Sequence, residues 1–256
     1  MNKTTKIIFL DLDGTLLTSE KTISKYTLSV LEECKRKGIL LVFATARSEA
    51  SSKRFVKIVK PNGLISNGGS LVRFGDEIIH KCTLDKITSD ALIIELLTRP
   101  ELRMLTVETD TGYYISHIGN YSSDYGHAVY YDFATPLFQD TYKVTIDVAT
   151  HKVVQEIANK FPNVSVTPFS GETWYRLAHI ESSKKNAAQK VIDFLGLNVA
   201  QTTAFGDDYN DIEILKLCGI GVAMGHAADR VKAISDYICE INDNDGVAKW
   251  LEKYVL

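Results

Sequence analysis

The chain has 256 residues, of which 45% are hydrophobic and 24% charged, a balance typical of globular proteins. Its formal net charge of −3 gives no support for nucleic acid or an anionic membrane as a partner, and no apolar run reaches the roughly 20 residues that a membrane span needs. The four cysteines are scattered without metal-like spacing and the short polar start is no signal peptide, so we expect a cytoplasmic protein.

The first predicted strand, residues 7–10, ends in two carboxylates. Asp11 and Asp13 follow it, and Gly14 comes directly after them. Ligands bind at the carboxyl ends of strands in open α/β sheets, and neighbouring carboxylates repel each other unless a cation or a shared proton is present. Taken alone, the pair is equally compatible with a helix cap or a solvated turn.

The chain then continues with alternating helix and strand patterns. We expect helices at residues 27–37 and 51–59, and strands at residues 39–44 and 64–66. This order predicts a parallel sheet with right-handed crossovers.

The middle of the chain reads differently. Residues 143–148 and 164–167 have strand patterns on either side of a helix pattern at residues 151–161, which predicts a separate α/β module. We expect its tyrosines to be core, edge-strand or interface residues rather than a substrate platform. These residues are Tyr113, Tyr114, Tyr121, Tyr125, Tyr130 and Tyr131.

Residues 183–256 return to the first pattern. A helix opens at Ser183 and Lys184, and strands are expected near residues 202–205, 220–223 and 237–238. A lysine in the first turn of a helix is usually a solvated surface charge, but it is mildly unfavourable toward the helix dipole, which adds some weight to a functional role for Lys184.

A second acidic cluster follows the strand at residues 202–205. Its sequence is Gly206-Asp207-Asp208-Tyr209-Asn210-Asp211, and taken alone this loop is compatible with a simple cap for the helix after it. Together with Asp11 and Asp13, it predicts a magnesium site made of a few hard oxygen ligands, with room for water and a substrate phosphate.

These pieces, in this order, resemble the haloacid dehalogenase-like phosphohydrolases, and within them the Cof-type phosphatases with a large cap. The first motif corresponds to residues 11–16, the second to Thr45, the third to Lys184 and the fourth to residues 206–211. Further family-like marks lie at residues 66–69, 221–225 and 242–248. The departures are Ala46 in place of a usual glycine, Lys185 in place of a glycine after Lys184, and His226 in place of a common asparagine. Lys185 is therefore a rival to Lys184, but we keep Lys184 because its spacing to Leu195-Gly196-Leu197 matches the helix and following turn of the family.

The resemblance implies an α/β fold with a Rossmann-like parallel-sheet core and an inserted α/β cap. We expect the core to comprise residues 1–81 and 183–256, and the cap, which would carry substrate specificity, residues 82–182.

The resemblance also implies roles for particular residues. Asp11 would be the nucleophile and form an aspartyl-phosphate, and Asp13 would be the general acid and base, with a pKa raised by its neighbouring carboxylates. Thr45 and Lys184 would bind the phosphoryl oxygens, with Lys184 also counted among the catalytic groups. Mg²⁺ would be held by the Asp11 carboxylate, the Asp13 main-chain carbonyl and the Asp207 carboxylate. Asp211, and secondarily Asn210 and Asp208, would orient the metal-bound water or the other ligands. Arg47 and Asn67 are candidates for binding the substrate or its phosphate, and Arg47 could equally be an ordinary helix charge.

The implied function is a magnesium-dependent phosphatase of small phosphorylated metabolites, foremost sugar phosphates, acting as a monomer or weak homodimer without a nucleic acid or membrane partner. Two alternatives stay open: a phosphomutase of the same superfamily, and a non-catalytic regulatory or binding protein on the same fold. The non-catalytic alternative is disfavoured because a binding role does not require all five residues of the proposed site. These residues are Asp11, Asp13, Thr45, Lys184 and Asp207.

Overall fold

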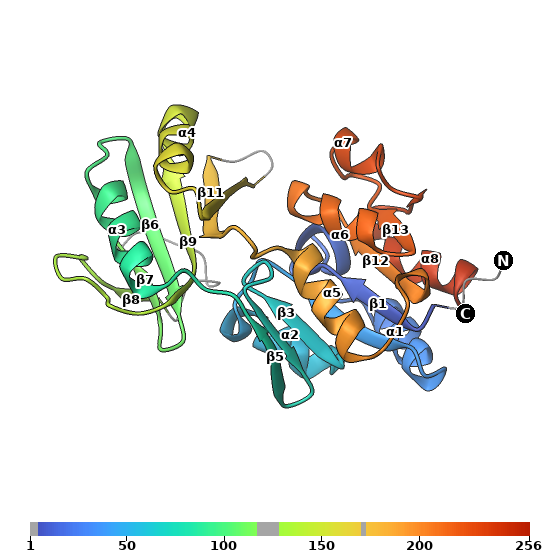
Figure 1. The fold of residues 1–256 in the computed structure, drawn as a ribbon. Helices are drawn as coiled ribbons and strands as arrows, with labels where there is room; N and C mark the ends of the chain where they lie inside the picture. The colour runs from blue at the N-terminus through green and yellow to red at the C-terminus, as the bar shows by residue number, and fades with distance from the viewer. Residues whose placement is uncertain (1–4, 117–127, 170–172) are drawn as a thin grey trace. The chain divides into compact units, whose positions relative to one another are not determined.

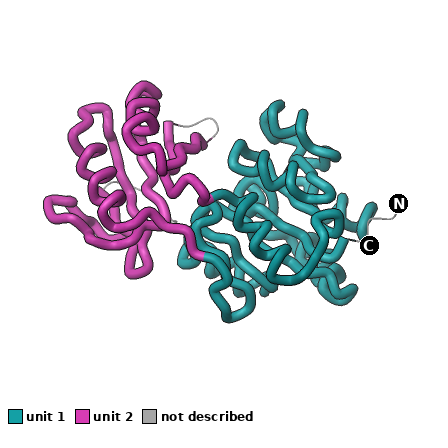
Figure 2. The backbone as a smooth tube through the Cα atoms, viewed as in Figure 1, with its two compact units in different colours: residues 1–80, 183–256 teal, residues 81–182 magenta. Residues whose placement is uncertain are grey.

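The computed structural model describes residues 5–116, 128–169 and 173–256. The chain divides into two compact units, one made of residues 1–80 and 183–256 and the other of residues 81–182 (Figure 2). We call them the core unit and the inserted unit, and describe each by itself.

The core unit is built on an eight-stranded sheet in the order β14-β13-β12-β1-β2-β3-β4-β5. Neighbouring strands from β14 to β3 are parallel, while β4 runs antiparallel to β3. The central strand β1 is completely buried because helices cover both faces of the sheet (Figure 1). The strands are β1 (Ile7–Leu10), β2 (Leu40–Ala44), β3 (Gly63–Ser66), β4 (Leu71–Phe74), β5 (Glu77–Lys81), β12 (Thr202–Gly206), β13 (Ile220–Ala223) and β14 (Tyr237–Ile238).

Three of the helices in this unit begin at serine caps. The side chains of Ser24, Ser48 and Ser183 each accept a hydrogen bond from a backbone N–H in the first turn of α1, α2 and α5, which satisfies a donor that the helix leaves unpaired. The helices are α1 (Lys25–Arg36), α2 (Glu49–Val59), α5 (Lys184–Phe194), α6 (Ile212–Leu217), α7 (Asp229–Lys232) and α8 (Gly246–Tyr254). Among the described residues, no helix combines the length and the apolar character that crossing a membrane requires.

In the part that the structure describes, the inserted unit has its own six-stranded sheet, in the order β10-β11-β9-β6-β7-β8. Helix α3 packs on β9 and α4 on β10, and the apolar side chains between them form a second hydrophobic core. The elements are α3 (Lys86–Leu97), β6 (Leu102–Thr109), β7 (Tyr113–Ile115), β8 (Val129–Tyr130), β9 (Thr141–Val148), α4 (His151–Lys160), β10 (Val164–Pro168) and β11 (Trp174–His179).

The tyrosines of this unit lie mostly where the sequence predicted. Tyr113 is buried, and Tyr114 and Tyr131 pack against the second core with their rings in edge contact. Tyr130 is exposed on the short strand β8, and Tyr121 and Tyr125 lie outside the described residues. The predicted fold class, a parallel-sheet core with an additional α/β module, is confirmed.

Candidate active site

The turn after β1 brings the first acidic pair beside the loop after β12. The chain turns at residues 12–16, where Gly14 has φ +74°. A Cβ atom at Gly14 would lie 2.3 Å from Asp207 Oδ2, so both the backbone conformation and the close approach require glycine. Thr15 Oγ1 then donates a hydrogen bond of 2.7 Å to Asp207 Oδ1, which ties the two loops together.

The loop after β12 is organised around the buried side chain of Asp211. Asp211 Oδ2 accepts hydrogen bonds of 3.2 Å from the backbone N–H groups of Asp207 and Asp208. Asp208 itself caps the short 3-10 turn Tyr209–Asp211. The helix-cap interpretation therefore describes Asp208 and the Oδ2 contacts of Asp211, whereas carboxylate oxygens of Asp207 and Asp211 also lie near Asp11.

Lys184, at the start of α5, is the buried cation of this site. Its Nζ lies 2.7 Å from Asp11 Oδ1 and 2.6 Å from Asp211 Oδ1, and its side chain is 1% exposed. Lys185 is half exposed and lies 3.9 Å from Glu213. The geometry thus favours Lys184 over its rival for the third motif.

The carboxylates of Asp11, Asp207 and Asp211 lie within 4.8 Å of one another. Burial raises the pKa of Asp11 and outweighs the lowering by Lys184, and the charges of Asp211 and Asp207 raise it further. Burial raises the pKa of Asp211 as well, and Asp207 raises it further, although Lys184 lowers it. For Lys184, burial would lower the pKa, but the two adjacent carboxylates raise it above its ordinary value.

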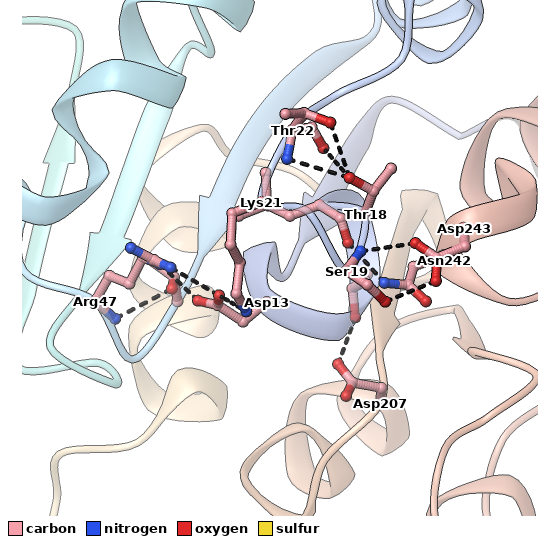
Figure 3. Close-up of polar contacts among 12 residues, drawn as sticks. Asp13, Thr18, Ser19, Lys21, Thr22, Arg47, Asp207, Asn242 and Asp243 are labelled. Carbon is pink, nitrogen blue, oxygen red and sulfur yellow. Dashed lines mark hydrogen bonds and ion pairs between the residues drawn. The ribbon is translucent and has the colours of Figure 1, made fainter. Parts of the chain in front are cut away.

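The contacts of Asp13 contradict the sequence-based prediction of its pKa. Arg47 Nε donates to Asp13 Oδ2 at 2.6 Å, and Arg47 Nη2 and Lys21 Nζ both donate to Oδ1 at 2.8 Å (Figure 3). Burial alone would raise the pKa of Asp13, but the hydrogen bonds and charges of Arg47 and then of Lys21 lower it to about 2. The prediction that neighbouring carboxylates raise this pKa is wrong, because two cations bind the side chain directly.

The carboxyl ends of β2 and β3 form one connected turn region. Thr45 is buried and its Oγ1 accepts a hydrogen bond of 3.1 Å from the backbone N–H of Arg47. The backbone N–H of Asn67 donates to Arg47 O at 2.8 Å, and that of Gly68 to Thr45 O at 2.9 Å. Arg47 precedes the α2 cap and its side chain is 11% exposed, so it is not the ordinary helix charge that one interpretation of the sequence allowed.

Three residues at the site escaped the sequence reasoning as contributors. Thr15 is within the first motif, but only the fold shows that it binds Asp207. Lys21 lies in a polar stretch that reads as a solvated loop, and no pattern marks it. His226, noted only as a departure from the family, has its Nε2 3.8 Å from Asp207 Oδ2.

The donor set fits a divalent cation. Asp11, Asp207 and Asp211 with Lys184 carry two more negative charges than positive when all are ionised, and hard carboxylate oxygens are the ligands that Mg²⁺ prefers. The buried Oδ1 of Asn210 has no hydrogen-bond partner among the residues that the structure describes, and an acceptor at this position suits a metal-bound water.

A Rossmann-like sheet with acidic loops and a buried lysine at the carboxyl ends of its strands defines a class of hydrolytic α/β enzymes. Residues 8–251 match the model of the haloacid dehalogenase-like hydrolases, and the chain therefore belongs to that family. The match confirms the resemblance seen in the sequence and the expected enzyme class, the phosphoric monoester hydrolases.

Similar proteins cover nearly the whole chain. A Bacillus subtilis 5-amino-6-(5-phospho-D-ribitylamino)uracil phosphatase, YitU, is 28% identical over 262 residues, covering 97% of both chains. The solved structure of the phosphatase BT1666 from Bacteroides thetaiotaomicron has a TM-score of 0.85 at 24% identity and covers 99% of this chain and 97% of its own. The sugar phosphatase BT4131, of subclass IIB, has a TM-score of 0.86 at 23% identity over 98% and 99%. Both structures share the fold.

Proposed function

We propose that the protein is a magnesium-dependent phosphatase of small phosphorylated metabolites and that the reaction passes through an aspartyl-phosphate on Asp11. The observation that carries this proposal is the buried cluster at the carboxyl ends of β1 and β12. There, Lys184 binds Asp11 at 2.7 Å while Asp207 and Asp211 lie within 4.8 Å. Neither a simple helix cap nor a surface ion pair needs this arrangement.

Asp11 is the nucleophile of the proposed reaction. Its carboxylate attacks phosphorus, the bond from phosphorus to the leaving oxygen breaks, and a difficult displacement is divided into two easier ones. Lys184 holds Oδ1 of Asp11, which fixes the orientation of the carboxylate. The ammonium, together with Thr45, also binds the phosphoryl oxygens and offsets their charge.

Asp11, Asp207 and the main-chain carbonyl of Asp13 would hold the magnesium ion, with Asp211 and Asn210 orienting its other ligands. When bound, the ion supplies the positive charge that lets a phosphate dianion approach a carboxylate. Burial, and after it the neighbouring carboxylates, raises the pKa of Asp11 and Asp211, and such an ion would stabilise their ionised forms.

Asp13 exchanges the proton in both half-reactions. With a pKa near 2, its carboxylate is ionised at neutral pH, the form that takes a proton from the water attacking the phosphoenzyme. In the first half-reaction it relays a proton to the leaving alkoxide, and a phosphate monoester with a second pKa of about 6 can bring that proton as its monoanion. Arg47 binds Asp13 in the structure and, with Asn67, remains a candidate contact for the substrate.

Sugar or sugar-alcohol phosphates are the favoured substrates. The relative YitU acts on a phosphoribityl compound and BT4131 is a sugar phosphatase, which supports a phosphorylated polyhydroxy chain. We assign substrate specificity to the inserted unit as a cap, because the phosphoryl chemistry resides entirely in the core unit. The free cysteines favour a reducing cytoplasm as the compartment.

The test is phosphate release from a panel of phosphorylated metabolites, with and without Mg²⁺, for the wild type and Asp11→Asn. We expect Mg²⁺-dependent release that is strongest on hexose or pentose phosphates and lost in the variant. Turnover that moves the phosphoryl group within the substrate without releasing phosphate would instead identify a phosphomutase. A folded wild-type protein that binds Mg²⁺ but transforms no compound would favour a regulatory protein.

A further inference from the structure

Lys21 lies on a tight turn between the first motif and α1. Thr18 N–H donates to Thr22 O at 2.9 Å and Lys21 N–H to Thr18 O at 2.8 Å, while the hydroxyls of Thr18 and Thr22 lie 2.9 Å apart. The turn directs the lysine side chain back toward the start of the site, where Nζ lies 2.8 Å from Asp13 Oδ1 (Figure 3).

The backbone of Lys21 adopts a left-handed conformation with φ +55°. Glycine takes this conformation without steric cost, whereas a residue with a Cβ atom is strained there. Strained residues persist where the surrounding structure holds them, and they gather at functional sites. A glycine would make this turn more easily, so what lysine adds is its ammonium group on Asp13.

A second segment, residues 242–245, holds the Lys21 turn in place. Asp243 accepts hydrogen bonds from Ser19 N–H at 2.7 Å and from Ser19 Oγ at 2.6 Å, and Asn242 Nδ2 donates to Leu17 O at 2.8 Å (Figure 3). These contacts span more than 220 positions of sequence. We call residues 242–245 the clasp.

The clasp also fixes the chain beyond the turn. Asp245 Oδ1 accepts hydrogen bonds from Ser24 Oγ at 2.5 Å and from Thr27 Oγ1 at 2.8 Å. Since Ser24 caps α1, the clasp binds the chain before and after Lys21. The sequence marked residues 242–248 as family-like without any role, and these contacts supply one.

The carboxylate of Asp13 is held by hydrogen bonds from two charged side chains. The Asp13 side chain is 38% exposed. Its position depends on the paired hydrogen bonds from the Arg47 guanidinium and on the ammonium of Lys21. A proton donor must lie within hydrogen-bond reach of the leaving oxygen, and a small displacement of a catalytic group costs rate.

We propose that Lys21 is a positioning residue for Asp13 and that the clasp, through Ser19 and Asp243, holds Lys21 in place. The inference rests on the proposed function in that Asp13 delivers the proton to the leaving group. Lys21 acts through Asp13, so its removal slows the reactions that need this proton.

The experiment compares two leaving groups in single-turnover reactions with saturating Mg²⁺ and substrate. p-Nitrophenolate leaves without protonation, whereas the alkoxide of a sugar phosphate requires it. For Lys21→Met we expect the rate of first-turnover leaving-group release to fall about tenfold or more on the sugar phosphate. On p-nitrophenyl phosphate the rate should fall by less than about threefold. This difference is expected when part of a general-acid contribution is lost. Lys21→Arg should restore most of the rate, and Lys25→Met, which removes an exposed lysine four positions along, should match the wild type.

Lys21→Gly separates positioning from structural support. It removes the ammonium and also relieves the left-handed strain, so its melting temperature should equal or exceed that of the wild type while its rate shows the same leaving-group dependence. Asp243→Asn should give a smaller loss with the same dependence. Equal losses on both substrates, or no loss for Lys21→Met, would overturn the inference.

Asp13→Asn in the same assay distinguishes this inference from the proposed function. A leaving-group-dependent loss in Asp13→Asn but not in Lys21→Met refutes only the role of Lys21. A loss in Asp13→Asn that is the same for both substrates refutes the proton-transfer role of Asp13, and the positioning role of Lys21 with it.

Discussion

At the scale of single residues, the charge state of Asp13 shows where sequence reasoning stops. The resemblance implied the residues of the site, motif spacing favoured Lys184 over Lys185, and the geometry supports that choice. The pKa of Asp13 did not follow, because Arg47 is 34 positions away and Lys21 reaches back through a turn. Motif spacing gives no information about which cation will bind a given carboxylate.

Replacing Arg47 by methionine should raise the pKa of Asp13 from about 2, because the paired hydrogen bonds are lost while burial still disfavours the ionised form. Carbon-13 NMR titration of the aspartate carboxyl groups in the metal-free protein measures this directly. Asp207 offers the control, since Asp207→Asn should leave the Asp13 titration in place. An unchanged titration of Asp13 in Arg47→Met would contradict the assigned cause.

The same pKa gives a pH dependence of stability. A depressed folded-state pKa stabilises the protein above the unfolded value of about 3.9, and that contribution is lost as the pH falls toward about 2. The destabilisation caused by Arg47→Met should therefore be largest near neutral pH and shrink below about pH 4. Urea unfolding at several pH values checks this, and a constant difference would exclude the linkage.

At the scale of elements, the sequence predicted those whose patterns are local. Strands β1, β2 and β12 are apolar runs bounded by polar or turn residues, and all three appear where expected. Helix α3 was not predicted, since its apolar residues are spread around the helix: Leu92 and Leu96 are buried, while Ile87 and Ile94 are exposed. The hairpin of β4 and β5 was also missed, because β5 is largely exposed and lacks an apolar run.

Gly69 shows how two elements of the site depend on one close approach. It has φ +111°, and a Cβ atom there would lie 2.2 Å from Ser183 O, directly before Lys184. Gly69→Ala should lower the free energy of unfolding by about 2 kcal/mol or more and reduce activity by displacing Lys184. Denaturant unfolding and phosphate release measure the two effects.

Gly75→Ala is the matched control for Gly69→Ala. Gly75 also has a positive φ, of +57°, but a Cβ atom there meets nothing within 4 Å. Gly75→Ala should lower the free energy of unfolding only by the backbone strain, about 1–2 kcal/mol, and leave activity unchanged. Equal effects of the two substitutions on both stability and activity would contradict the steric explanation.

At the scale of the whole molecule, the site joins segments from both ends of the chain into one electrostatic unit. Asp11, Lys184, Asp207 and Asp211 come together only because β1 lies beside β12 and α5 packs near the loop that follows β12. The sequence predicted this meeting from its two acidic clusters and the resemblance, but not that Lys184 would bind both Asp11 and Asp211. The remaining excess of negative charge destabilises the metal-free protein and favours binding of a cation.

Magnesium binding should therefore raise the melting temperature of the wild type. Ligand at a hundredfold above its dissociation constant contributes about 2.7 kcal/mol, which corresponds to a shift of about 5–10 °C for a chain of this size. Asp207→Asn should remove most of this shift, and in chelator it should melt about 2–4 °C above the wild type because one crowded charge is gone. Thermal melts with Mg²⁺ and with chelator provide the test, and an equal magnesium shift in both proteins would exclude Asp207 as a ligand.

The central claim is that Asp11 carries the phosphoryl group during turnover. The most direct measurement is acid quenching of the enzyme during the reaction, followed by mass spectrometry of the peptide that contains Asp11. We predict one added phosphoryl group on Asp11, more abundant in Asp13→Asn with a good leaving group and absent in Asp11→Asn. Sustained phosphate release by the wild type with no phosphorylation of Asp11 at any quench time, or full activity of Asp11→Asn, would contradict the account.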